Sequence, residues 1–176
     1  MPNPNRVTLR ARTDADVDML FALAGELETW EERNPSAPAP LTRRAYETRL
    51  AKTDEDPSGD LRFVIDVDGV AVGTVSLFDV DDLARHAEVG IALLPQYRGK
   101  GIGTAAIKAI VEFAFVRCNL RRVHLQAIAS NLGAIRAYQN AGFAEEGRLR
   151  EHAWVRGGYE DIVLMGALRR EWTSAG

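Results

Sequence analysis

The stretch Leu94-Pro-Gln-Tyr-Arg-Gly-Lys-Gly-Ile-Gly-Thr104 decides how this chain is interpreted. A β-strand is expected to end at Pro95, and a long helix is expected to begin near Ile102. Between these elements lie Gly99, Gly101 and Gly103, and glycine lets backbone N–H groups approach an anion without interference from a Cβ atom. The start of a helix adds unpaired N–H donors and the positive end of its dipole. The sequence therefore predicts a site for a phosphate or pyrophosphate.

Other phosphate-binding patterns fit this loop poorly, although Arg98 and Lys100 supply positive charge. A Walker loop needs Ser or Thr after its lysine, and Lys100 is followed by Gly101. A dinucleotide fingerprint needs the spacing G-x-G-x-x-G, whereas the spacing here is G-x-G-x-G. The remaining alternative is a glycine-rich turn without a ligand. Alternating glycines between a strand and a helix, with basic neighbours, favour the anion site.

The surrounding pattern predicts one α/β domain over residues 1–176, with a mixed, strongly twisted sheet flanked by helices. Asp68-Gly69 predicts a hairpin, and Thr13 and Thr42 are expected to cap the first two helices. No repeat or linker divides the chain. The expected strands are Val7–Arg10, Arg62–Val67, Val70–Phe78, Glu88–Leu94, Arg122–Ala129, Phe143–Val155 and Tyr159–Leu168, and the later helices are Thr42–Ala51, Ile102–Val116 and Asn131–Ala141. The resulting order is βααββ followed by βαβαββ.

Composition excludes several classes of protein. The formal net charge is -3, which gives no electrostatic case for a nucleic-acid partner. The single cysteine, Cys118, rules out an internal disulfide and fits a reducing cytoplasm. No stretch approaches the roughly 20 apolar residues of a membrane span, and Met1 to Leu9 lacks an apolar run of signal-peptide length. We therefore expect a cytoplasmic protein without a membrane partner.

The glycine loop and its neighbours resemble the GNAT superfamily of N-acetyltransferases. The acetyl-CoA motif of that superfamily is Arg or Gln, two residues, Gly, one residue, and then Gly or Ala, and Arg98, Gly101 and Gly103 meet it. An Ala-Glu-x-Gly strand start at Ala87 to Gly90 and a proline at Pro95 match the surroundings of the motif. The resemblance is close from Phe63 to Met165, and residues 1–60 match only in element order.

Two later segments extend the resemblance. Asn131-Leu-Gly-Ala-Ile-Arg-Ala-Tyr138 and Asn140-Ala-Gly-Phe143 look like the second signature of the superfamily. The tail, Glu145 to Leu149 and Arg156 to Asp161, resembles the branch of spermidine and ribosomal-protein acetyltransferases. The resemblance implies a GNAT fold, acetyl-CoA as cofactor, and transfer of the acetyl group to a primary amine by direct attack on the thioester.

The resemblance also implies where the cofactor binds. Its pantetheine arm is expected to pair like an extra strand with the backbone at Ile91, Ala92 and Leu93, where two strands splay apart. Asn131 is expected both to cap a helix and to contact the cofactor. Arg136 is expected near the 3′-phosphate, with an ordinary solvated arginine as the alternative. The predicted pyrophosphate loop comprises Arg98, Gly99, Lys100, Gly101, Ile102, Gly103 and Thr104.

Two residues are predicted to move protons. A phenol with a pKa of about 10 can protonate a departing thiolate whose parent thiol has a pKa of about 8.5, and Tyr138 matches the family position for this role. Glu88 is the best candidate base, because an alkylamine with a pKa of about 10.4 is almost entirely protonated at neutral pH. The alternatives are a half-buried structural tyrosine at Tyr138, and backbone carbonyls or water in place of Glu88.

A metal ion is not expected. His86, His124 and His152 are scattered along the sequence without metal-ligand spacing. Cys118 lacks a paired histidine, so a structural thiol is favoured over a nucleophile.

The acceptor is predicted to be a small primary amine, attracted by carboxylates near the end of the first helix and by the last hairpin. The predicted contacts are Glu28, Glu31, Glu32, Tyr159 and Glu160. The segment from Glu32 to Pro40 departs from the spermidine branch, which puts polyamine specificity in doubt. A peptide N-terminus as acceptor and a non-catalytic acetyl-CoA sensor are the alternatives. A homodimer is common in the resembled branch and is possible here.

Overall fold

The computed structural model describes residues 6–27, 40–54 and 59–172 of the chain. Its strands are β1 (Val7–Arg10), β2 (Leu61–Val67), β3 (Val70–Asp81), β4 (His86–Leu93), β5 (Arg122–Ile128), β6 (Ala144–Val155) and β7 (Gly158–Leu168). Its α-helices are α1 (Val17–Gly25), α3 (Arg43–Asp54), α4 (Ile102–Glu112) and α5 (Leu132–Asn140). Short helical turns are η2 (Asp14–Asp16), η3 (Pro95–Tyr97) and η4 (Phe113–Arg117). The predicted element order and mixed sheet are confirmed.

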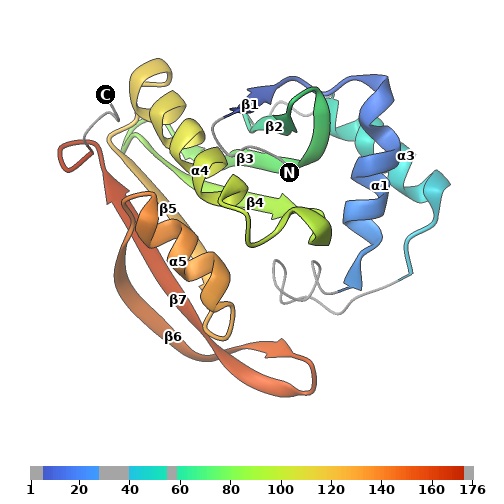
Figure 1. Ribbon diagram of the computed structural model, residues 1–176. Coiled ribbons are helices and arrows are strands. Elements are labelled where there is room, and N and C mark those ends of the chain that lie inside the picture. The colour runs from blue at the N-terminus through green and yellow to red at the C-terminus, as the bar shows by residue number, and fades with distance from the viewer. Residues whose placement is uncertain (1–5, 28–39, 55–58, 173–176) are drawn as a thin grey trace.

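The sheet has seven strands in the order β1-β2-β3-β4-β5-β7-β6. All neighbouring pairs are antiparallel except β4 and β5, which pair in parallel over only His86 to Glu88 on β4. Beyond Glu88 these two strands diverge, as Figure 1 shows. The predicted splay is therefore present, and among the described residues no strand pairs with the β5-facing edge of β4 from Val89 onward.

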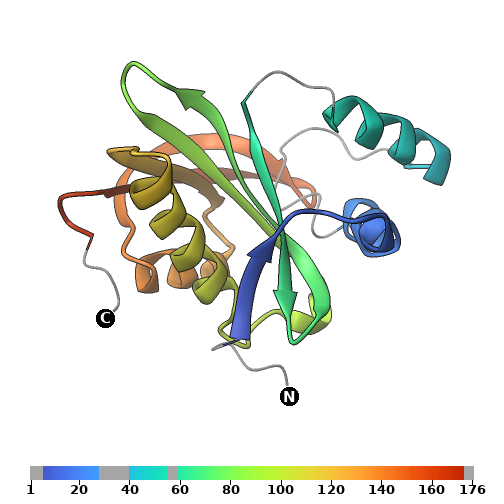
Figure 2. The ribbon, with the colours of Figure 1, turned by 90° about the horizontal axis from the view of Figure 1, so that it is seen from above.

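Two helical layers cover the sheet. Figure 2 shows α1 and α3 on one side of strands β2 to β4, and α4 and α5 on the other. The apolar face of α4 is fully buried at Ile102, Ile107 and Ile110, in one core with Val75 and Leu77 of β3. This core holds the start of α4 rigidly against the end of β4, which positions the glycine loop between them.

The helix predicted over Ile102–Val116 is wrong at its C-terminal end. The α-helix stops at Glu112, and η4 continues as one π-helical turn that closes with a hydrogen bond from Cys118 N to Phe113 O at 3.2 Å. Both phenylalanines of this turn pack on distant aromatic rings: Phe113 on Phe63 at 5.1 Å, and Phe115 on Trp172 at 5.8 Å between ring centroids. Helical periodicity carries no information about these tertiary contacts, so the sequence could not reveal the wider turn.

The N-terminal strand and α1 are joined by a buried ionic network. The Arg10 guanidinium donates to Asp16 at 2.8 Å and to Asp66 at 2.9 Å. Both carboxylates are almost fully buried, and hydrogen bonds from Arg10 hold the pKa of Asp16 well below its usual range. The network therefore ties β1, η2 and β2 together at the point where the α1 layer begins.

None of the helices in the described part of the chain has the length and apolar content that a membrane crossing requires.

Candidate active site

Two of the three glycines in the loop have a backbone conformation that favours glycine. Gly99 has φ +70° and Gly101 has φ +79°, a left-handed conformation that other residues adopt at a cost. Gly101 is the N-cap of α4, and its carbonyl accepts a hydrogen bond from Ala105 N at 3.0 Å. At Gly103 a Cβ atom would meet only Leu93 Cδ1, at an ordinary 3.6 Å. The first two glycines therefore set the turn, whereas the third leaves space beside the helix start.

The Arg98 side chain connects this loop to the end of β4 and to the residue after α1. Its Nε donates to Leu93 O at 3.0 Å, which fixes the guanidinium to the end of β4. One terminal nitrogen donates to the Glu26 carboxylate at 3.3 Å, just after α1. Arg98 thus connects the glycine loop with the helical layer on the other side of the sheet.

A cavity of about 530 Å³ opens between β4, the glycine loop, α4 and α5. All of the predicted cofactor residues line it except Lys100 and Ile102. Lys100 instead donates from Nζ to Gln96 O at 2.6 Å, and the Ile102 side chain is fully buried in the core. The residues that line the cavity are Ile91, Ala92, Leu93, Arg98, Gly99, Gly101, Gly103, Thr104, Ile107, Asn131, Gly133, Ala134, Arg136, Ala137, Tyr138 and Asn140.

Helix α5 brings Tyr138 to this cavity. Asn131 caps the helix, with Oδ1 accepting from Ala134 N at 3.1 Å, as the sequence predicts. Tyr138 is 9% exposed, and its ring packs on Phe143 at 6.2 Å between centroids. The structure therefore places the phenol and the glycine loop around one space, although they lie far apart in the sequence.

Glu88 lies at the point where β4 and β5 separate. It pairs with His124 on β5 and with Phe78 on β3, and it lines neither the cavity beside the glycine loop nor the one between α1 and α3. Burial raises the pKa of Glu88, the negative charge of Asp79 raises it further, and a hydrogen bond with Gln126 partly opposes both effects. A carboxylate with a raised pKa is a stronger base than an exposed one, which suits a group that accepts a proton from an amine.

Two histidines that the sequence presented as scattered are neighbours in the fold. The rings of His86 and His124 are 5.4 Å apart, and the Nδ1 atom of each is buried without a hydrogen-bond partner in the described structure. Burial lowers the pKa of His124, and the charges of Arg122 and His86 lower it further. The described residues contain no group of three or more potential metal ligands. Because the two histidines are far apart in sequence, only strand pairing reveals that they flank Glu88.

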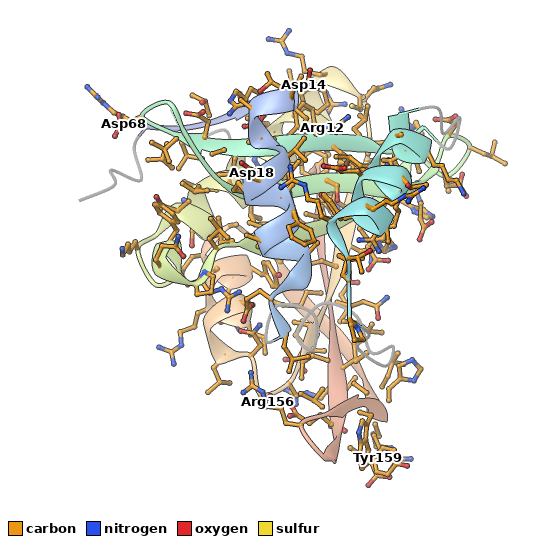
Figure 3. All side chains as sticks on the ribbon, turned by 90° about the vertical axis from the view of Figure 1, so that its right-hand side faces the viewer. Arg12, Asp14, Asp18, Asp68, Arg156 and Tyr159 are labelled. Carbon is orange, nitrogen blue, oxygen red and sulfur yellow. The ribbon has the colours of Figure 1, made fainter. Side chains whose placement is uncertain are left out.

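Of the predicted acceptor contacts, the structure describes only Tyr159 and Glu160. Glu28, Glu31 and Glu32 lie outside the described residues. Tyr159 is 69% exposed near the tip of the β6–β7 ribbon (Figure 3) and packs on Trp154 at 4.8 Å. Glu160 accepts a hydrogen bond from Ser130 N at 3.1 Å, and neither of these hairpin residues lines the cavity beside the glycine loop.

Similarity to known proteins agrees with this geometry. A family model described as an acetyltransferase (GNAT) domain matches residues 6–144. The chain belongs to the GNAT family. The predicted family, fold, enzyme class and acetyl-CoA cofactor are thereby confirmed.

Individual GNAT relatives differ in what they are named for. Spermidine N(1)-acetyltransferase of Escherichia coli K12 is 30% identical over 168 residues, which cover 94% of this chain and 87% of that protein. Putative ribosomal N-acetyltransferase YdaF of Bacillus subtilis is 36% identical over 105 residues, covering 60% of this chain and 57% of that protein. A crystal structure of spermidine N-acetyltransferase from Vibrio cholerae, in complex with CoA and spermine, has a TM-score of 0.86 at 26% identity and covers 95% of this chain and 98% of that one.

Proposed function

We propose that this protein transfers the acetyl group of acetyl-CoA to the primary amine of a small molecule, which attacks the thioester directly. One observation carries the proposal. A single cavity beside the splayed strands is lined both by the glycine loop and by Tyr138. A cofactor with a pyrophosphate and a reactive thioester needs both features in one site.

Each part of the cavity suits one part of the cofactor. The backbone of Ile91, Ala92 and Leu93 lies on the β4 edge that lacks β5 as a partner, so its polar groups are available to an extended arm. The N–H groups of Gly99 to Thr104 and the start of α4 suit a pyrophosphate. Arg136 is an exposed side chain on the same cavity and suits the 3′-phosphate. Bound acetyl-CoA supplies the acetyl group in an activated thioester.

Two side chains of this protein would move the protons. The amine nitrogen forms a bond to the carbonyl carbon while the carbon–sulfur bond breaks. Tyr138 donates its phenolic proton to the departing sulfur, because a phenol and a thiol have similar pKa values of about 10 and 8.5. Glu88 accepts the proton that the amine releases, directly or through water, and its raised pKa strengthens it for this role.

The small-amine acceptor is supported by the relatives that match most of the chain. The spermidine enzymes of Escherichia coli and Vibrio cholerae align over 94% and 95% of this chain, respectively, whereas the ribosomal relative YdaF aligns over 60%. A peptide N-terminus therefore remains the second candidate. The presence of Tyr138 on the cavity counts against a sensor without activity. The homodimer and the cytoplasmic location stay predictions, the latter resting on the single cysteine.

The decisive experiment combines calorimetry with an assay of CoA release. The wild-type protein should bind acetyl-CoA and release CoA when a primary amine is supplied. Tyr138→Phe keeps the ring and removes the proton, so kcat should fall by about 10² or more with little change in acetyl-CoA affinity. Wild-type turnover in this variant would remove Tyr138 from the mechanism. Acetyl-CoA binding without transfer to any amine would contradict the proposed activity and favour the sensor.

A further inference from the structure

The face of the sheet that is turned away from α4 carries Glu88. Alternation along β4 places Ala87 and Val89 in the core beneath α4 and Glu88 on the opposite face. On the same face of β3, Thr74 and Ser76 line a second cavity, of about 560 Å³, between α1, α3 and strands β2 and β3. Figure 2 shows these two helices on that side of the sheet. The acceptor amine must therefore approach the thioester from this face if Glu88 is to take its proton.

Strand β3 contains one extra residue beside Glu88. Phe78 pairs with Glu88 and Asp81 pairs with His86, so two residues of β3 between these pairs oppose one residue of β4. This irregularity is a β-bulge, which commonly redirects a side chain next to an active site. Asp79, the first residue of the bulge, has φ +50°, a left-handed conformation that few residues with a side chain adopt. An unfavourable backbone in such a place indicates that the side chain has a role there.

The core does not require the extra residue. Leu77 and Val80 both pack in the core beneath α4, and two residues, Phe78 and Asp79, lie between them instead of the single residue of a regular strand. A strand without Asp79 would therefore keep the alternation of its other side chains. What the bulge adds is an exposed and negatively charged side chain next to the residue that pairs with Glu88.

The charge of Asp79 acts on two groups of this face. Burial raises the pKa of Glu88, and Asp79 raises it further. Burial lowers the pKa of His124, which pairs with Glu88 across the two strands, and Asp79 opposes that change. The other charged or titratable side chains beside this pair are Asp81 on β3, His86 on β4, Arg122 on β5 and Glu146 on β6, and the last of these forms an ion pair with Arg122.

We propose that Asp79 is a positioning residue for Glu88: the bulge of β3 holds its carboxylate where its negative charge favours transfer of the acceptor's proton to Glu88. This inference rests on the proposed acetyl transfer with Glu88 as the base. The acceptor arrives as an ammonium ion, because an alkylamine has a pKa of about 10.4. One N–H bond breaks, the proton moves to a carboxylate oxygen of Glu88, and the electron pair left on nitrogen attacks the thioester carbon. Glu88 becomes neutral while Asp79 keeps its charge, so the repulsion between the two carboxylates is relieved in this step.

Two variants of Asp79 test the charge apart from the shape of the bulge, in the CoA-release assay followed across pH. Asp79→Asn keeps the shape of the side chain, and Asp79→Gly accepts the left-handed backbone readily. Without the repulsion Glu88 loses its proton at lower pH, so the acid limb of kcat/KM should move to lower pH in both. At a pH on that limb the variants should be at least about twofold more active than the wild type, an effect that about 1 M salt should reduce.

Asp68→Asn is the matched control. Asp68 is also an exposed aspartate with a left-handed backbone, at φ +55°, but it lies at the other end of β3 and pairs with Arg6. Its acid limb should coincide with that of the wild type. In a Glu88→Gln background, Asp79→Asn should leave the pH profile unchanged, because the titrating base is gone. An unmoved acid limb in both Asp79 variants, an equal displacement in Asp68→Asn, or a displacement that persists in Glu88→Gln would overturn the inference.

A titration of Glu88 by carbon NMR separates this inference from the proposed activity. The side-chain carboxyl signal of Glu88, identified by its loss in Glu88→Gln, can be followed without any substrate. Its titration should move to lower pH in Asp79→Asn and stay in place in Asp68→Asn. An unmoved titration in Asp79→Asn would overturn the role of Asp79 while leaving acetyl transfer intact. A displaced titration in a protein that acetylates no amine would instead contradict the proposed function, and with it the catalytic purpose of the bulge.

Discussion

The cavities on the two sides of the sheet are built in different ways. The cavity on the α4 side is lined by a glycine loop and a helix start that come from one stretch, Leu94 to Thr104. The cavity on the α1–α3 side is lined by side chains from separate segments, such as Arg12, Arg49 and Arg62. Recognition by backbone leaves a contiguous pattern of glycines, whereas recognition by side chains leaves no local pattern. This difference explains why the cofactor could be predicted from the sequence, whereas the lining of the second cavity could not.

Gly101→Val should have the largest effect, and it should be confined to the cofactor side. The branched side chain would block the approach of the pyrophosphate to several backbone N–H groups, so acetyl-CoA affinity should fall about 100-fold or more. Calorimetry on the folded variant measures this loss. The positive φ of Gly101 adds strain, so thermal unfolding should be recorded alongside.

The control for this variant is Gly103→Ala. An added Cβ at Gly103 meets only Leu93 Cδ1 at 3.6 Å, and the family motif allows alanine there. Its acetyl-CoA affinity should stay within about threefold of the wild type, because no N–H donor is lost. Unchanged affinity in folded Gly101→Val would contradict the assignment of the loop.

Glu88→Gln tests whether Glu88, which lies where β4 and β5 separate, acts as the base. The pKa of Glu88 is raised by burial and by Asp79, so the carboxylate becomes active only as pH rises through a value above its ordinary range. The wild-type kcat/KM should therefore show an acid limb there. Glu88→Gln should abolish this limb and lower kcat/KM at pH 7 about 30-fold, a moderate effect for loss of a general base that water can partly replace.

Asp79→Asn serves as the companion variant for the pH profile. Removing the negative charge of Asp79 should lower the pKa of Glu88, so the acid limb should move to lower pH while activity at neutral pH is retained. The left-handed backbone of Asp79, with φ +50°, tolerates asparagine. An unaltered acid limb in Glu88→Gln would assign the ionisation to another group.

Glu26→Gln should have the smallest effect and reports on the contact between the two sides. The Glu26 carboxylate accepts a hydrogen bond from Arg98 at 3.3 Å and so competes with a pyrophosphate for this guanidinium. Its removal should tighten acetyl-CoA binding about two- to threefold, in line with the modest strength of partly exposed ion pairs. Glu47→Gln, which disturbs only the Arg43 pair on α3, should leave the affinity unchanged. Weaker binding in Glu26→Gln would mean that Glu26 holds Arg98 in place for the phosphates.

Much of the fold, and most of the lining of the cavity beside the glycine loop, could be predicted because the signals are local. The hairpin at Asp68-Gly69, the cap at Asn131 and the order of strands and helices all appear in the structure as the sequence predicts. The features that the sequence did not predict all depend on tertiary contacts. The π-helical turn at Phe113 depends on rings from other elements, and the His86–His124 pair depends on the short parallel register of β4 and β5.

By itself, the sequence determined the glycine loop, the start of the helix behind it and therefore the kind of cofactor, since backbone conformation depends mainly on neighbouring residues. Only the tertiary structure decided what lies on the other side of the sheet. The sequence pointed to carboxylates and a cationic acceptor, whereas the charged residues in the described lining of the α1–α3 cavity are Arg12, Arg49, Asp60 and Arg62. Side chains from Arg12, Arg49 and Arg62 meet there because β2, α1 and α3 pack together, and such long-range packing is absent from any local pattern of residues.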